Sequence, residues 1–366
     1  MAKFGKTAKD LIKYLKNKKC VINGDTGLKN FKNTVKNNAN SKVIDVHNIG
    51  DSITLGSHAG ENNASWIVNG YSPLLNTDFA NRYELVGQFI HSEFGVLGDY
   101  WTYTGTWTSD SNYGFVSQNH KTTVQNSTAS IQFTGTGVDV FLHKRSGFGG
   151  IAEIYVDDVL KATINCNGTT APYVERITGL EYGTHTLLIK KSDATAYPIY
   201  VLGMCSTKGN HGVRVNTMGI SGITMAYGAG VGITSQFDSI LWPNLELTTI
   251  AFGVNDYKLQ TNIDTFRTQL QNIITAAKAR GDVLLIWPSI RDPSTVTGGS
   301  TYSQKDYVDV YDELAKSNNV AFLNMYKMLG SSFAAAQATG LLYDTVHLNS
   351  AGHSYLEKII FKLLTT

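Results

Sequence analysis

Val43-Ile44-Asp45-Val46-His47-Asn48-Ile49-Gly50-Asp51-Ser52 starts as a run of β-branched and apolar residues and ends in residues that favour a turn. A short apolar run that stops at a glycine predicts a buried strand followed by a turn. Similar runs occur at residues 245–252, 283–287 and 320–323, and residues 263–280 have apolar side chains at helical spacing. Strands that alternate with helices predict an α/β fold with a parallel, three-layer sheet. Ligands of such sheets bind beyond the carboxyl ends of the strands, which is where we expect Ser52.

Residues 106–206 have a different pattern, because short alternating segments such as Val138-Asp139-Val140-Phe141-Leu142 are separated by glycine-rich or polar turns. Several strands of this length predict an antiparallel β-sandwich. The αβ alternation resumes after it, so we expect an inserted domain. The predicted organisation is an N-terminal appendage at residues 1–38, a discontinuous α/β domain at residues 39–105 and 207–366, and the inserted sandwich at residues 106–206.

The composition is that of a folded protein with few charges. Hydrophobic residues make up 42% of the 366 residues, charged residues 16%, and the formal net charge is +2. This balance gives no reason to expect a nucleic-acid partner, and it suits an extracellular, glycan-facing or virion-associated protein. The sequence has neither an apolar run long enough to span a membrane nor the apolar region of a signal peptide. We therefore expect no membrane span, and either another route of export or a signal outside this sequence.

The cysteines and most histidines show no metal-binding spacing. Cys20, Cys166 and Cys205 form no CxxC pair, and at most a Cys166–Cys205 bridge is conceivable. No HExxH motif occurs, so the sequence predicts no metal and no cofactor. Six of the nine histidines are interpreted as structural or surface residues: His58, His120, His143, His185, His211 and His353.

Two polar motifs at opposite ends of the chain supply the parts of a nucleophilic site. A serine hydroxyl needs a base beside it, and Asp344-Thr345-Val346-His347 places a carboxylate three residues before an imidazole. In a turn this spacing allows Asp344 to hold one ring nitrogen of His347 while the other faces Ser52. The pair precedes a final helix that we expect Ser350 to cap.

Three donors for a developing oxyanion are predicted. Gly219 has no Cβ and can present its backbone N–H close to a substrate. Asn255 follows the strand at residues 245–252 and can supply a side-chain amide. The backbone N–H of Ser52 is the third donor.

Four short motifs follow one another along the chain: Gly-Asp-Ser at Ser52, Gly-x-Ser-Gly at Gly219, Gly-x-Asn-Asp at Asn255 and Asp-x-x-His at His347. In this order they resemble the four sequence blocks of the SGNH (GDSL-like) hydrolase superfamily. The resemblance covers residues 43–105 and 207–366 and implies a flavodoxin-like α/β/α fold. Gly-Asp-Ser-Ile-Thr looks more like the carbohydrate-esterase side of the superfamily than the lipase side. Thr217 stands where many relatives have Asn, which leaves a secondary hydrogen bond open. Segments 133–137 and 180–186 of the insert resemble jelly-roll modules that accompany polysaccharide esterases.

The predicted function is that of a serine esterase that removes short acyl groups, in the first place acetyl, from a polysaccharide through Ser52, His347 and Asp344. One alternative is a lipase, thioesterase or arylesterase that acts on small or lipid esters. The other is a glycan-binding adhesin or phage tail component in which the hydrolase fold is only a scaffold. Sugar rings stack on aromatic faces, and the candidate aromatic residues for such binding are Trp66, Tyr71, Trp101, Tyr103 and Trp107.

Overall fold

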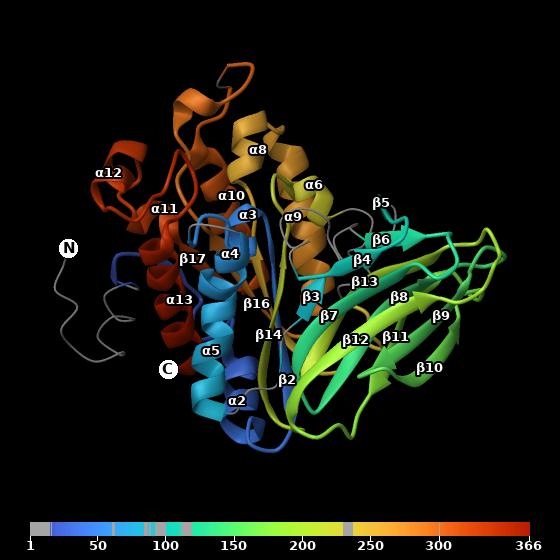
Figure 1. The fold of residues 1–366 in the computed structure, drawn as a ribbon. Coiled ribbons are helices and arrows are strands. Elements are labelled where there is room, and N and C mark those ends of the chain that lie inside the picture. The colour runs from blue at the N-terminus through green and yellow to red at the C-terminus, as the bar shows by residue number, and fades with distance from the viewer. Residues whose placement is uncertain are drawn as a thin grey trace.

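The protein consists of a layered α/β part and an antiparallel β part that lie side by side (Figure 1). The computed structural model describes residues 15, 17–60, 63–83, 87, 89–91, 100–110, 119–229, 237–299 and 301–366. Within these ranges no helix is both long and apolar enough to cross a bilayer.

The α/β part is built on a six-stranded sheet with the order β1-β17-β16-β15-β2-β14. Its strands are β1 (Val21–Ile22), β2 (Val43–Gly50), β14 (Gly212–Gly219), β15 (Leu245–Ala251), β16 (Asp282–Trp287) and β17 (Ala321–Asn324). Five strands are parallel, whereas β1 runs antiparallel to β17. The sheet is therefore mixed rather than wholly parallel as predicted. The parallel strands, numbered along the chain, lie in the order 2-1-3-4-5.

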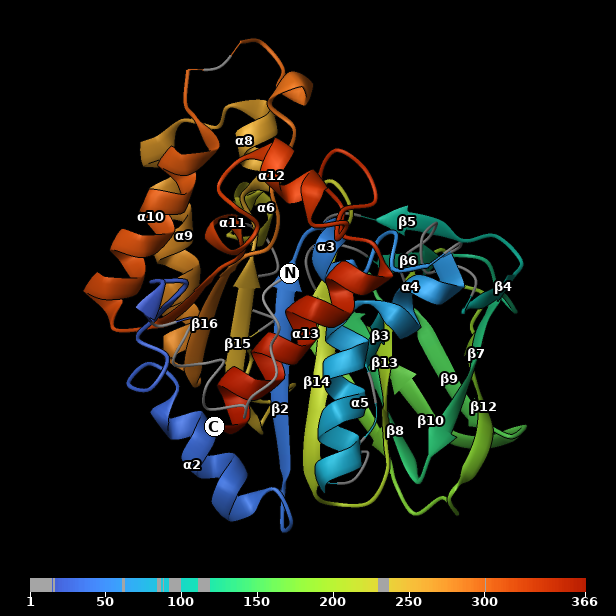
Figure 2. The same ribbon diagram turned by 90° about the vertical axis from the view of Figure 1, so that its left-hand side faces the viewer.

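Long helices cover the sheet, as Figures 1 and 2 show. One face carries α2 (Lys29–Asn38), α5 (Tyr71–Tyr83) and α13 (Ser350–Thr365), and the other carries α9 (Ile263–Lys278) and α10 (Gln304–Asn318). The buried side of α9 is made by Phe266, Leu270, Ile273 and Ile274, at the spacing that the sequence predicts. Helix α13 starts at Ser350, but its cap is Asn349, whose side chain accepts a hydrogen bond from the Gly352 N–H.

The segment predicted as an N-terminal appendage belongs to the α/β part from residue 20 onward. Strand β1 is the edge strand of the main sheet, and Phe31 and Val35 of α2 are buried in its core. The Phe31 N–H also donates to Asp282 Oδ2 at 2.8 Å. Lysines are frequent in this segment and suggest a solvent-exposed chain, but the apolar side of α2 packs against the sheet and places the segment in the core. Residues 1–14 and 16 lie outside the described residues.

The β part consists of two antiparallel sheets, with the orders β10-β9-β12-β7-β4 and β11-β8-β13-β6-β5, and β3 also pairs with β13. The strands are β3 (Phe89–His91), β4 (Thr102–Thr104), β5 (Thr108–Asp110), β6 (Asn119–Thr122), β7 (Thr128–Gly135), β8 (Gly137–Lys144), β9 (Ile151–Val156), β10 (Val159–Asn165), β11 (Ala171–Ile177), β12 (Gly183–Lys191) and β13 (Ile199–Thr207). Inward-facing side chains of both sheets form a second hydrophobic core.

The two parts share a packed junction. Phe89, Phe141 and Trp242 form an aromatic cluster whose ring centroids are 4.8 to 5.7 Å apart. Arg214 on β14 pairs with Asp45 on β2 at 2.7 Å and lies 3.7 Å from Asp139 on β8. Removing the insert would therefore expose apolar surface and leave a buried cation with one partner fewer.

Candidate active site

The turn after β2 holds Ser52 at the carboxyl end of the main sheet. Ser52 is the first residue of the short helix α3 (Ser52–Leu55), and the Asp51 side chain accepts a hydrogen bond from the Ile53 N–H at 2.9 Å. A Cβ at Gly50 would lie 2.6 Å from the Ala251 carbonyl oxygen, so only glycine fits between the two strands. Ser52 itself is only 5% exposed. Strand, turn and helix together fix the position of its hydroxyl.

His347 and Asp344 approach Ser52 from the loop between α12 (Phe333–Ala338) and α13. His347 Nε2 lies 2.9 Å from Ser52 Oγ, and His347 Nδ1 lies 2.8 Å from Asp344 Oδ2. The Asp344 Oδ1 accepts the backbone N–H groups of Val346 and His347, which fixes the carboxylate. Residues 295 positions apart in the sequence thus form one hydrogen-bonded chain.

The protonation state of Asp344 determines which ring nitrogen of His347 carries the proton. Burial acts to raise the pKa of Asp344, but hydrogen bonds from the His347 ring and from two backbone N–H groups hold it well below its usual range. An ionised carboxylate only accepts hydrogen bonds, so His347 Nδ1 carries the proton. Nε2 is then an unprotonated acceptor that points at the Ser52 hydroxyl, which is the arrangement a general base needs.

Asn255 lies in the first turn of α8 (Val254–Leu259), directly after β15. Its Nδ2 donates to the Ile223 carbonyl at 2.9 Å, and its Oδ1 accepts from Arg291 Nη2 at 3.0 Å. Arg291 also donates from Nε to the Val254 carbonyl at 2.9 Å. These contacts fix the amide orientation and leave one Nδ2 hydrogen for another acceptor. Arg291 is a residue that the sequence analysis missed, because nothing in its neighbourhood in the sequence connects it with Asn255.

Gly219 is the last residue of β14, in register with Gly50 of β2. A Cβ at this position would be 2.2 Å from the Leu55 backbone nitrogen, so the glycine is needed where the strand end meets α3. Gly222, three residues later, has a φ of +78° and open space where a Cβ would be. The carbonyl of the following residue, Ile223, accepts the hydrogen bond from Asn255 Nδ2. Gly222 lies in the same loop as Ile223, and the sequence analysis did not select it.

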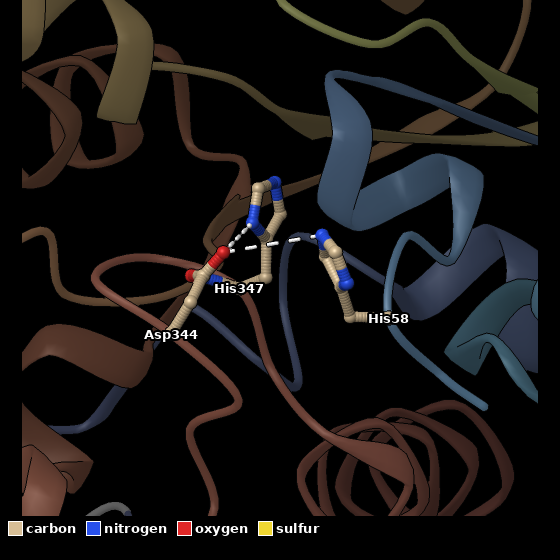
Figure 3. Close-up of side chains that lie close together, drawn as sticks. All are labelled: His58, Asp344 and His347. Atoms are coloured by element: carbon tan, nitrogen blue, oxygen red, sulfur yellow. Dashed lines mark hydrogen bonds and ion pairs between the residues drawn. The ribbon is translucent and has the colours of Figure 1, made fainter. Parts of the chain in front are cut away.

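His58, which the sequence analysis treated as a structural or surface residue, lies beside His347 and Asp344. Its Nε2 lies 3.9 Å from Asp344 Oδ2, and its ring centroid is 4.6 Å from that of His347 (Figure 3). The ring stacks on Tyr343 at 4.3 Å and also contacts Trp66. A loop far from His347 in the sequence brings it there, so sequence spacing alone gave no signal.

Two further carboxyl groups are buried near this edge of the sheet. Burial raises the pKa of Asp51 to about 7, although the Ile53 N–H acts to lower it. Burial likewise raises the pKa of Asp256 to about 6, and Asp256 Oδ2 accepts the Met225 N–H at 2.9 Å. Both residues link backbone segments around Ser52 and Asn255, and neither contacts His347 directly in the described hydrogen bonds.

A cavity of about 400 Å³ opens beside Asp344. It is lined by Asp292, Phe333, Gln337, Leu342, Tyr343, Asp344 and Thr345. Tyr343 is 61% exposed, so its ring is available to a ligand. A larger cavity of about 760 Å³ lies at the far end of α5, around Arg82 and Lys208, away from Ser52.

The aromatic residues predicted to bind sugar do not form one exposed face. Tyr71 and Trp101 are buried, and Tyr103 and Trp107 pack against the core of the β part.

All three cysteines are buried and free, so the conceivable Cys166–Cys205 bridge does not form.

Residues 182–355 match the model of the GDSL-like Lipase/Acylhydrolase family, a span that contains Gly219, Asn255, Asp344 and His347. A search of curated proteins gives no match. Among solved structures, a peptidoglycan O-acetylesterase superposes with a TM-score of 0.70 at 14% identity, and the match covers 94% of this chain and 98% of that one. This likeness shows a shared fold.

Two other solved structures overlap less. A lipase/acylhydrolase from Enterococcus faecalis is 23% identical over 42% of this chain and 77% of that one, with a TM-score of 0.35. A family two carbohydrate esterase from Clostridium thermocellum is 15% identical over 71% of this chain and 97% of that one, with a TM-score of 0.29. The family match over residues 182–355 and the shared fold confirm the resemblance noted in the sequence: residues 182–355 carry a domain of the GDSL-like lipase/acylhydrolase type, and the protein is a carboxylic ester hydrolase.

Proposed function

We propose that the enzyme is a serine esterase that removes short acyl groups, in the first place acetyl, from a polysaccharide, with Ser52, His347 and Asp344 as its catalytic residues. The observation that carries the proposal is the chain of hydrogen bonds from Asp344 through His347 to Ser52, at 2.8 and 2.9 Å. Its distances and its direction are those of a nucleophile, a base and an orienting carboxylate.

The reaction starts when Ser52 Oγ attacks the ester carbonyl carbon and His347 Nε2 takes the hydroxyl proton. The imidazolium that forms is stabilised by Asp344, and its proton passes to the leaving sugar oxygen as the C–O bond breaks. Water then attacks the acyl-enzyme, again with His347 as the base, and releases the carboxylic acid and free Ser52.

The negative charge on the carbonyl oxygen needs donors fixed before the reaction. The proposed donors are the Ser52 N–H, the Gly219 N–H and the free Nδ2 hydrogen of Asn255. Asn255 is supported best, because its other amide contacts are already satisfied by Ile223 and Arg291. Preorganised donors of this kind cost no reorganisation when charge develops.

A polysaccharide substrate is supported by the surroundings of the site. Tyr343 exposes an aromatic face at the rim of the 400 Å³ cavity next to Asp344. A sugar ring can stack on the face of Tyr343 that does not contact His58, since aromatic faces bind the apolar faces of sugar rings. The β part, which extends the molecule beside the site, provides additional surface for a polymer.

The finer features of the fold belong to the same proposal. The order 2-1-3-4-5 of the parallel strands is the flavodoxin-like order, and helices lie on both faces of the sheet. We interpret the six-stranded sheet with its helices as this hydrolase domain and strands β3 to β13 as an inserted, jelly-roll-like sandwich, which begins before the predicted boundary at residue 106. The shared core at Phe141 and Trp242 implies that the two fold together.

The test compares p-nitrophenyl acetate, butyrate and octanoate with acetylated polysaccharides, using release of acetate as the common measurement. We expect turnover that falls with acyl length, and release of acetate from at least one acetylated polymer. Tyr343→Ala should reduce activity on polymer more than on p-nitrophenyl acetate, and Ile240→Ala, an exposed apolar residue outside the β part, is the control. Turnover that rises with chain length would favour a lipase, and polymer binding without hydrolysis would favour an adhesin.

A further inference from the structure

Three side chains with metal-binding atoms converge beside the nucleophile. His58, Asp344 and His347 each offer one such atom, and these atoms all lie within 4.8 Å of one another. Asp344 Oδ2 is the common neighbour, 2.8 Å from His347 Nδ1 and 3.9 Å from His58 Nε2, and Figure 3 shows both rings directed at this carboxylate. The distances are close to those between ligands that share one small ion.

We propose that His58, Asp344 and His347 form a binding site for a divalent transition-metal ion, such as Zn²⁺, and that the bound ion inhibits the esterase reversibly. Two imidazoles and one carboxylate are the ligand types that Zn²⁺ and its neighbours prefer, and three protein ligands leave a coordination position for water. The inhibition rests on the proposed role of His347 as base, whereas the binding does not.

The backbone of His58 indicates that its side chain is held for more than packing. Its φ is +65°, in the left-handed region that non-glycine residues seldom occupy. This conformation turns the ring toward Asp344, and stacking on Tyr343 with a centroid distance of 4.3 Å fixes its plane. Residues held in such conformations cluster at functional sites.

Solvent reaches all three ligands. The side chains of His58, Asp344 and His347 are 28%, 34% and 19% exposed. An ion can therefore enter without opening the core.

The inhibition follows from the two nitrogens of His347. A metal ion on Nδ1 occupies the lone pair there, so the ring proton moves to Nε2. Nε2 then donates a hydrogen bond to Ser52 Oγ instead of accepting the serine proton, and the base is lost. The ion also neutralises Asp344, which would otherwise stabilise the imidazolium. Both changes are reversed when a chelator removes the ion.

The experiment separates binding from catalysis. Zn²⁺ binding is measured by calorimetry on Ser52→Ala, which keeps all three ligands and needs no activity. Inhibition of p-nitrophenyl acetate hydrolysis by Zn²⁺, and its reversal by EDTA, is measured on the wild type. We expect one ion per chain and inhibition at concentrations that match the binding curve.

Variants of His58 test whether the ion binds at His58, Asp344 and His347. His58→Asn tolerates the left-handed backbone, and His58→Phe keeps the stacked ring, but neither supplies the imidazole ligand. In both we expect Zn²⁺ affinity and Zn²⁺ inhibition to fall by about tenfold or more. The control is His185→Asn. His185 also forms a hydrogen bond with a carboxylate, Asp157, at 2.7 Å, but this pair does not include a second histidine. Unchanged Zn²⁺ affinity in both His58 variants, or no binding to Ser52→Ala, would overturn the proposal.

Discussion

Arg291 Nη2 donates a hydrogen bond of 3.0 Å to Asn255 Oδ1, so a buried cation holds the amide of the residue that we propose as an oxyanion donor. The same amide donates to the Ile223 carbonyl at 2.9 Å. With both heavy atoms engaged, the amide cannot flip, and the guanidinium charge polarises its N–H groups. This relationship makes Asn255 a preorganised donor and Arg291 its positioning residue.

Asn255→Ala should lower kcat by about a hundredfold to a thousandfold with little change in KM, because the donor acts mainly when charge develops on the oxygen. Steady-state kinetics with p-nitrophenyl acetate measure both constants. Asn318→Ala is the control, since Asn318 also forms side-chain hydrogen bonds but at the distant end of α10. A loss confined to KM would argue against the oxyanion role.

Arg291→Lys should lower kcat by about tenfold in the wild type and have little effect in the Asn255→Ala background. The reason is that the arginine acts through the amide, so the two changes are coupled rather than additive. A double-mutant cycle on kcat tests this. Equal effects of Arg291→Lys in both backgrounds would mean that Arg291 supports activity by a route that does not involve Asn255.

Asp344→Asn should reduce kcat by about three to four orders of magnitude while the protein stays folded. The amide Oδ1 can keep the two backbone N–H groups, so the NH2 group replaces Oδ2 and donates to His347 Nδ1. The ring proton then sits on Nε2, which can no longer accept the serine proton. Asp157→Asn removes the carboxylate of the other His–Asp pair, and it should leave turnover unchanged. Circular dichroism and kcat measured on the same samples distinguish lost chemistry from lost structure.

Glu357→Gln should stabilise the protein above neutral pH. Burial on α13, together with the neighbouring Asp78, raises the pKa of Glu357 from 4.5 to about 8. A carboxyl with a raised folded-state pKa contributes full stability below its unfolded pKa, and that contribution is lost as the pH rises toward 8. Glutamine has the same shape and does not ionise, so its melting temperature should exceed that of wild type by a few degrees at pH 9 and match it near pH 4.5.

Thermal unfolding at several pH values tests the stability difference, with the exposed Glu313→Gln as the control. A difference between Glu357→Gln and wild type that does not depend on pH would show that Glu357 is not protonated in the folded protein.

Local patterns predicted strands β2, β15, β16 and β17 and helices α9 and α13 of the α/β part, because each buries one apolar side or run, but they did not predict β14 or α5. Strand β2 and helix α9 lie where their apolar spacing placed them. The prediction that residues 20–38 form an appendage was wrong, because the many lysines around Phe31 and Val35 obscured the apolar side of a short amphipathic helix. The antiparallel pairing of β1 depends on its contact with β17, about 300 residues away, which no local pattern encodes.

The sequence predicted one site for Ser52, His347 and Asp344, and the structure joins these three by hydrogen bonds, whereas their catalytic roles and the oxyanion donors stay predictions. It did not predict His58 or Arg291, which reach the site through a left-handed loop residue and a side chain from another segment. Local patterns also do not show which candidate aromatic rings are buried and therefore closed to a sugar. Tyr71 is fully buried, whereas Tyr343, next to Asp344, is exposed.

The central claim is that Ser52 is the nucleophile, and covalent labelling tests it most directly. The protein is treated with a fluorophosphonate ester, which reacts with activated serine hydroxyls, and the labelled peptide is identified by mass spectrometry alongside Ser52→Ala. The account predicts one phosphonyl group on Ser52, complete loss of p-nitrophenyl acetate hydrolysis on labelling, and neither label nor hydrolysis in Ser52→Ala. Labelling at another serine, or a folded Ser52→Ala that hydrolyses the ester at the wild-type rate, would contradict it.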